Sequence, residues 1–206
     1  MAEQKKPFGT ALKITFAITF LVFIWSGIAP RDYFTWFLEV VPAIIALIIL
    51  VATFKNFRFS DFIYILICFH AMILMVGGHT TYADNALFNW LRDVFDLERN
   101  YYDRLGHFAQ GFVPALIANE ILFRKNIVST RTWRYFLIIF TILGFSAFYE
   151  FFEWFAAIAT GEAATAFLGT QGDVWDTQWD MFMCFIGSII AIFSLAKWQE
   201  KRLREK

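Results

Sequence analysis

Six apolar stretches constrain most strongly what this chain can fold into. The hydrocarbon core of a bilayer is about 30 Å thick, and an apolar helix of about 20 residues crosses it. The stretches cover roughly residues 14–29, 33–54, 61–78, 105–123, 135–159 and 181–196. The hydrophobic fraction of the whole chain is 59%, above the usual range for globular proteins. The sequence therefore predicts an all-α, multi-pass membrane protein, with a bundle of six transmembrane helices in a single domain over residues 1–206.

The distribution of basic residues predicts how these helices are oriented. Basic residues are retained on the cytoplasmic side of a membrane. Fourteen Lys and Arg residues lie in the amino-terminal segment, the second and fourth loops and the tail, and four lie in the loops on the other side. We therefore expect a bacterial inner-membrane protein with both termini in the cytoplasm. The three lysines before residue 14 are also compatible with a secretory signal peptide, but Pro30 directly after Ala29 argues against cleavage there.

The connection from His79 to Arg104 lies on the predicted outer side and contains a helical pattern of its own. Its apolar residues recur at helical spacing, with Asp84 or Asn85 as the predicted cap. They are Leu87, Trp90, Leu91, Val94 and Phe95. The pattern predicts a short amphipathic helix, which either lies on the outer membrane surface or covers the end of the bundle.

Ionisable side chains gather at the outer ends of the predicted spans. Such groups are costly inside a membrane, and they usually face a cavity, a partner or the bundle interior. Glu150 and Glu153 stand three residues apart and Asp103 and His107 four apart, so each pair shares a helical face. If these faces turn inward, they surround one polar pocket. The expected set is Glu39, His79, Asp103, His107, Glu150, Glu153, Asp173, Asp176 and Asp180.

This concentration of acids requires compensation by protons, by arginine or by a divalent cation, because unpaired carboxylates there would cost several kcal/mol each. Arg104 is the only nearby basic residue that we expect to reach the pocket. Plainer interpretations remain open for single residues. Asp103 and Asp173 could be helix caps, and His79 could be an ordinary interfacial residue. On the inner side we expect one interfacial ion pair, between Glu120 and Arg124.

Three motifs carry a resemblance to known families. YYDRLGHFAQGFVPALIANEIL, EFFEW and GTQGDVWDTQWDMFMCFIGS, in this order, resemble the YjdF-like family of bacterial inner-membrane proteins. This resemblance covers nearly the whole chain and implies a membrane protein, but no reaction. A looser pattern is similar to the VanZ-like membrane proteins, and its expected Gln and Arg are not clearly matched. The matching positions are Asp103, Gly106, His107, Phe108, Asp176, Asp180 and Gly187.

The residues support three functional hypotheses. The first is metal-assisted hydrolysis or transfer on a lipid or lipid-linked substrate, with Zn, Mn or Mg as the divalent ion. Its predicted metal ligands are His79, Asp103, His107, Glu150 and Asp176, and its predicted catalytic residues are Glu153 and Asp180. The second is a non-catalytic protein that binds an ion or a partner. The third is a proton-coupled transporter with Glu39, His70, Glu150 and Glu153 as its relay. The balanced charge, 18 basic against 18 acidic residues, gives no indication of a nucleic-acid partner, and we expect none.

Overall fold

The computed structural model describes residues 7–161 and 165–205, and this part of the chain is all helical, as predicted. The long elements are α1 (Thr10–Ser26), α2 (Tyr33–Thr53), α3 (Asp61–Thr80), α5 (Tyr102–Arg124), α6 (Arg131–Thr160) and α8 (Asp176–Ala191). The short elements are the 3-10 turn η1 (Tyr82–Asp84), α4 (Ala86–Phe95) and α7 (Thr165–Leu168). A π-helical segment (Ile192–Ala196) joins α8 to α9 (Lys197–Arg204).

Within residues 7–161 and 165–205, four helices are long and apolar enough to cross a membrane. They are α2, α3, α6 and the continuous helix Asp176–Arg204. Helix α1 is apolar but has only 17 residues, and α5 has 23 residues but carries several charged side chains. The described part of the chain therefore contains four candidate membrane spans. Crossing by α1 and α5, which the predicted total of six requires, stays a prediction.

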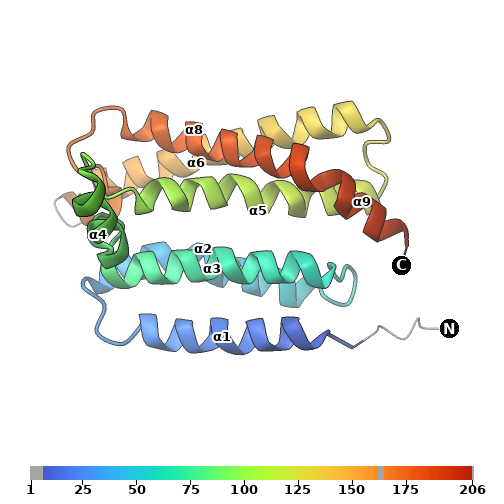
Figure 1. Ribbon diagram of the computed structural model, residues 1–206, viewed down its shortest axis with the longest axis horizontal. Coiled ribbons are helices and arrows are strands. Elements are labelled where there is room, and N and C mark those ends of the chain that lie inside the picture. Colours follow the sequence, from blue (N-terminus) through green and yellow to red (C-terminus); the bar gives the residue numbers. More distant parts are fainter. Residues whose placement is uncertain (1–6, 162–164, 206) are drawn as a thin grey trace.

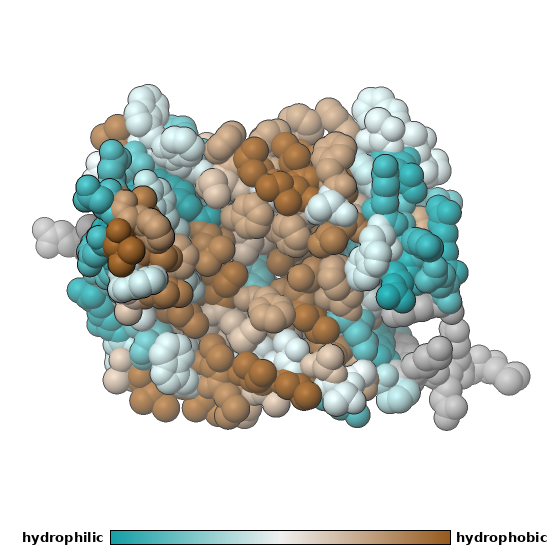
Figure 2. All heavy atoms as spheres, in the orientation of Figure 1, coloured by the Kyte–Doolittle hydropathy of each residue, from teal (hydrophilic) through white to brown (hydrophobic). Residues whose placement is uncertain are grey.

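The long helices run side by side along the longest axis of the molecule (Figure 1). Helix α3 packs against α1, α2 and α5, while α5, α6 and α8 pack against one another. Ile63, Leu116, Ile138 and Ile192 are fully buried in the core that joins these two groups. Figure 2 shows apolar residues over the middle of the visible face and hydrophilic residues toward both ends. A belt of this kind matches a protein whose helices lie across a bilayer.

The beginning of α1 and the end of α9 lie at the same end of the bundle, and α4 lies at the other (Figure 1). We call these the terminal end and the α4 end. Every predicted apolar stretch coincides with a helix. The first helix ends at Ser26 rather than Ala29, because the chain turns there and Ala29 has a φ of 49°. The sixth begins earlier and ends later than predicted, since the polar residues at both ends continue the helix.

Helix α4 occupies the segment where the sequence predicted a short helix. The Asn85 side chain caps it by accepting a hydrogen bond from the Phe88 N–H at 3.3 Å. Leu87, Trp90 and Val94 are exposed on its surface. These contacts are compatible with α4 on the membrane surface and with α4 over the end of the bundle. Both placements stay predictions.

Polar side chains at the terminal end hold α3, α5, α6 and α9 together. The predicted pair is confirmed, with Glu120 2.9 Å from Arg124, and Glu120 also accepts hydrogen bonds from Ser60. A second network was not predicted: Glu200 is buried and lies 2.7 Å from Arg134 and 3.0 Å from Arg131. This end is therefore more polar than the sequence suggested. Its buried charges have partners, which is typical of a structural anchor.

Helices α5 and α8 approach so closely that glycine is required on each. A Cβ at Gly111 would lie 1.9 Å from the Cys184 carbonyl oxygen, and one at Gly187 would lie 2.2 Å from the Phe108 carbonyl oxygen. Small residues permit this backbone contact between membrane helices. The contact fixes α5 relative to α8, and Asp103, Asp176 and Asp180 lie near the beginnings of these two helices.

Candidate functional site

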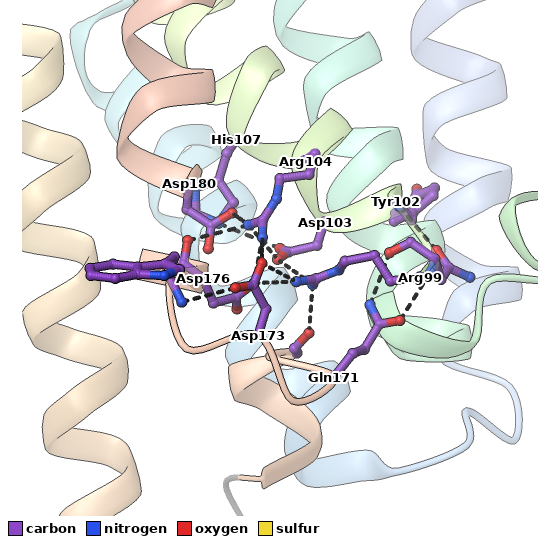
Figure 3. A network of polar contacts seen from close by, with 12 residues as sticks. Arg99, Tyr102, Asp103, Arg104, His107, Gln171, Asp173, Asp176 and Asp180 are labelled. Atoms are coloured by element: carbon purple, nitrogen blue, oxygen red, sulfur yellow. Dashed lines mark hydrogen bonds and ion pairs between the residues drawn. The ribbon is translucent and has the colours of Figure 1, made fainter. Parts of the chain in front are cut away.

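The candidate site forms where α5 and α8 begin, at the α4 end of the bundle. Helical spacing places Asp103 and His107 one above the other on α5, and likewise Asp176 and Asp180 on α8. The close packing of α5 on α8 turns both pairs toward each other (Figure 3). All four side chains are buried. The structure thus brings together four of the residues that the sequence singled out.

Two arginines hold the aspartates in place. Arg104 lies 2.6 Å from Asp176, 3.2 Å from Asp173 and in direct contact with Asp180. Arg99 lies 2.6 Å from the same Asp176 oxygen and 3.3 Å from Asp173. The prediction that Arg104 alone reaches the pocket is therefore wrong. Arg99 was missed because it precedes α5 in a connection with no regular pattern, and only the fold turns it back toward α8.

The loop between α7 and α8 is fixed to the chain before α5. The Asn100 N–H donates to the Gln171 side chain at 3.0 Å, and the Gln171 amide donates to the Asn100 carbonyl at 2.9 Å. Arg99 also donates to the Gly169 carbonyl at 3.1 Å. Gln171 and Gly172 both have positive φ, which turns the chain back toward α8. These bonds set the position of Asp173, which lies in the same loop.

The two predicted cap assignments differ in the structure. Helix α8 begins at Asp176 after Trp175, and Asp173 accepts a hydrogen bond from the Trp175 N–H, so it is not the N-cap residue. Helix α5 begins at Tyr102, and Asp103 lies inside its first turn. Both acids instead face the arginines. Their charges are therefore available to the site.

His107 presents one ring nitrogen to two carboxylates. Its Nδ1 lies 2.8 Å from Oε1 of Gln110, an acceptor, which places the ring proton on Nδ1. Nε2 faces Asp103 Oδ1 at 3.4 Å and Asp180 Oδ1 at 3.7 Å, and it is a third acceptor when the ring is neutral. Three acceptors in such an arrangement require a proton or a cation between them. Donor atoms about 2.1 Å from a tetrahedral metal ion would lie about 3.4 Å apart, close to the observed separations.

The formal charges of this cluster do not balance. Two positive charges, on Arg99 and Arg104, face four negative charges on the aspartates, which leaves two negative charges when His107 is neutral. Asp103 Oδ2 is buried and accepts no hydrogen bond. The ligand atoms of Asp103, His107 and Asp180 lie within 4.8 Å of one another. This set has the charge and spacing that suit one divalent cation.

The other predicted ligands are not part of this converging set. His79 lies at the end of α3, where its Nδ1 is 3.1 Å from the Ser26 carbonyl oxygen and its ring stacks near Trp25. Asp176 contacts both arginines, and its carboxylate oxygens are outside the group of ligand atoms that converge on one point. Glu150 is buried on α6, and its Oε1 accepts no hydrogen bond. Position near a span end could not separate His79 from the others, because helix rotation decides which side chains meet.

A cavity of about 140 Å³ lies beside His107. Helices α2, α3, α5 and α6 and the turn η1 enclose it. Its lining residues are Glu39, Pro42, His70, Leu74, Tyr82, Gly106, His107, Gln110, Tyr149 and Glu153. Burial, together with the charge of Glu39, raises the pKa of Tyr82 well above its ordinary value, so this hydroxyl stays protonated. His107 therefore belongs both to the aspartate cluster and to the cavity wall.

Comparison with known proteins agrees with the membrane character of the fold. Residues 11–201 match the family described as Predicted membrane protein (DUF2238). The inner membrane protein YjdF of Escherichia coli strain K12 is 46% identical over 184 residues, which cover 89% of this chain and 88% of the relative. No solved structure shows significant similarity. The chain belongs to the DUF2238 family of predicted membrane proteins.

Proposed function

We propose that this protein is a divalent-metal-dependent membrane enzyme that hydrolyses or transfers a group on a lipid or lipid-linked substrate. The observation that carries the proposal is the convergence of Asp103, His107 and Asp180, whose ligand atoms lie within 4.8 Å of one another. Asp180, which the sequence suggested as a catalytic residue, becomes a metal ligand in this proposal. Gln110 orients the His107 ring through a hydrogen bond at Nδ1, as the hydrogen-bond partners of metal-binding histidines commonly do.

Three protein ligands leave a coordination position for water or substrate. One imidazole and two carboxylates suit Zn or Mn better than Mg, which prefers oxygen ligands alone. A bound ion of this kind would polarise a phosphoryl or carbonyl oxygen or activate a water molecule. Glu153 lines the cavity beside His107 and is the proposed general base.

The substrate class follows from the location of the cavity. It lies among helices that cross the apolar belt, so a substrate reaches it most directly from the bilayer. In the proposed topology, α1 and α5 also cross the membrane, which gives six transmembrane helices. Both termini then lie in the cytoplasm and the site lies at the outer leaflet, in agreement with the distribution of Lys and Arg.

One observation favours a second candidate, a non-catalytic ion-binding protein. Arg99 and Arg104 tie the loop before α8 to α5, and such a network can serve assembly of the fold alone. In that case a bound cation would complete the charge balance without any reaction. The two candidates share the metal site and differ in whether a lipid is chemically changed.

Metal analysis of protein purified in detergent tests the shared part of both candidates. We expect about one divalent ion per chain in the unchanged protein and loss of that ion in His107→Ala. His79→Ala is the matched control, because it removes the same side chain at the same end of the bundle but outside the ligand set. No bound metal in the unchanged protein, or equal content in both variants, would remove the site.

Lipid analysis separates the enzyme from the ion-binding protein. Membranes are compared from cells that lack the gene and from the same cells complemented with unchanged protein, His107→Ala or His79→Ala. The enzyme predicts a lipid whose amount changes on deletion and is restored by the unchanged protein and His79→Ala, but not by His107→Ala. Identical lipid profiles in all four strains would exclude catalysis on a membrane lipid.

A further inference from the structure

We infer that the cavity beside His107 binds the ammonium group of an amphiphile that enters from the bilayer. The inference rests on the proposed function, because it names the substrate class of the same site. Glu39 of α2 and Glu153 of α6 both line this cavity, together with Tyr82 and Tyr149. No Lys or Arg is among the described residues that form its wall.

The charges of the cavity call for a cation. Glu39 is 3% exposed and lines the cavity beside Tyr82, and its carboxylate offers four acceptor sites. A buried carboxylate without a cationic partner is unfavourable, and a cation would compensate it. The arginines of the candidate site do not do so, since they donate to the aspartates and to the Gly169 carbonyl. An anionic ligand would be repelled by both Glu39 and Glu153.

Aromatic rings complete a wall suited to an ammonium group. A Cβ at Gly77 would lie 1.8 Å from the Tyr82 ring, and one at Gly106 would lie 3.1 Å from it. Two glycines thus make room for this ring at the edge of the cavity. Ammonium groups bind favourably over the faces of tyrosine rings. Tyr82 and Tyr149 supply such rings, and the two glutamates supply the charge.

The size and depth of the cavity indicate a head group rather than a whole lipid. A volume of about 140 Å³ accommodates a few non-hydrogen atoms. Glu39 lies about 9 Å along α2 from Tyr33, at the rise of an α-helix, and therefore below the α4 end. Pro42 and Leu74 add apolar surface to the same wall. An aminophospholipid and a free alkylamine share the required ammonium group.

Binding to chelator-treated protein tests this inference apart from the metal site. The protein is held in mixed micelles with equal amounts of phosphatidylethanolamine, N-acetylated phosphatidylethanolamine and phosphatidylglycerol, and the retained lipid is measured by native mass spectrometry. A separate arm uses dodecylammonium. We expect preferential retention of phosphatidylethanolamine, and about tenfold weaker retention in Glu39→Gln, because a charge-assisted contact is lost. Retention of dodecylammonium alone would identify a free amine as the source of the ammonium group.

Two further variants make the result decisive. Glu153→Gln should weaken retention as Glu39→Gln does, whereas Glu98→Gln, which removes an exposed acid at the α4 end, should leave it unchanged. Unfolding temperatures confirm that each variant is folded. Equal retention of the three phospholipids together with no binding of dodecylammonium would overturn the inference, as would weakening by neither cavity variant. Because no metal is present, these outcomes are independent of whether the proposed metal site exists.

Discussion

Arg104 is the residue on which the charge balance of the candidate site depends most. Its guanidinium contacts Asp173, Asp176 and Asp180, and all but Asp173 are buried. Breaking a buried pair by removing one partner leaves uncompensated charge, which costs more than the pair itself contributes. Pattern and spacing predicted that Arg104 meets this cluster. They could not predict Arg99 or the exclusion of His79, because both depend on how the connections fold back over the helix ends.

Replacement of Arg104 by Gln should strongly destabilise the protein. Loss of the charge leaves Asp180 without an arginine partner and leaves Asp173 and Asp176 with Arg99 alone. We expect a decrease in the free energy of unfolding of about 3–5 kcal/mol. Arg92→Gln is the control, since Arg92 pairs with Asp93 at a more exposed position and should change stability by less than about 1 kcal/mol. Chemical unfolding in detergent measures both. Equal, small effects would show that the arginine network is not important for stability.

Asp32, the N-cap residue of α2, should make the stability of the folded protein depend on pH. Its side chain accepts a hydrogen bond from the Thr35 N–H at 2.6 Å, and this backbone bond lowers the pKa of Asp32 below its usual value. The folded state therefore binds the proton less well than the unfolded state. The stabilisation is complete above the ordinary pKa of 3.8 and is lost as pH falls through the lower folded pKa.

Substitution at Asp32 separates the cap from its charge. Asp32→Ala should cost about 1 kcal/mol at neutral pH, because the N-cap acceptor is lost. Asp32→Asn keeps an acceptor and should retain most of this stability but lose the contribution to the pH dependence. Chemical unfolding measured from about pH 2 to about pH 7, a range that spans the ordinary carboxyl pKa, compares the three proteins. The same acid dependence in Asp32→Asn would contradict this assignment.

At the level of elements, the packing of α5 on α8 determines whether a site forms at all. Gly111 and Gly187 allow the backbones to approach, and the aspartates of α8 then meet His107. The sequence predicted the helices from their apolar length, and each predicted stretch coincides with one. It could not predict which helices touch, because glycine in a membrane helix is compatible with several partners.

Gly111→Ala should separate α5 from α8 and disturb the site. The new methyl group would lie 1.9 Å from the Cys184 carbonyl oxygen, so the helices must move apart, at a cost of about 1–3 kcal/mol. Gly144→Ala on α6 is the control, because nothing lies within 4 Å of its Cβ, and alanine favours a helix by about 1 kcal/mol. Thermal unfolding should therefore shift in opposite directions. Metal content should fall only in Gly111→Ala.

At the scale of the whole molecule, an apolar belt separates two polar ends of the helix bundle (Figure 2). The beginning of α1 and the end of α9 share one end of the bundle, and the candidate site lies at the other (Figure 1). Hydropathy and the distribution of Lys and Arg predicted this arrangement, since they depend on the bilayer rather than on side-chain packing. The residues of the cavity were only partly predicted, because an enclosed space depends on the rotation of every surrounding helix.

Cysteine labelling tests which side of the membrane each end faces. Val174→Cys lies in the exposed loop before α8, and Ile127→Cys lies in the exposed loop after α5. The native Cys68 and Cys184 are buried and free. A membrane-impermeant maleimide added to spheroplasts should label Val174→Cys and should label Ile127→Cys only after lysis. The reverse pattern would place the candidate site on the cytoplasmic side.

In the proposed metal site, Asp103, His107 and Asp180 hold one divalent ion. X-ray absorption spectroscopy of the purified, metal-loaded protein tests this site, because the spectrum identifies the ligand atoms. We expect a shell of nitrogen and oxygen ligands at about 2.0–2.2 Å with one imidazole, and loss of the imidazole signal in His107→Ala. A metal without an imidazole ligand, or an imidazole signal that persists in His107→Ala, would contradict it.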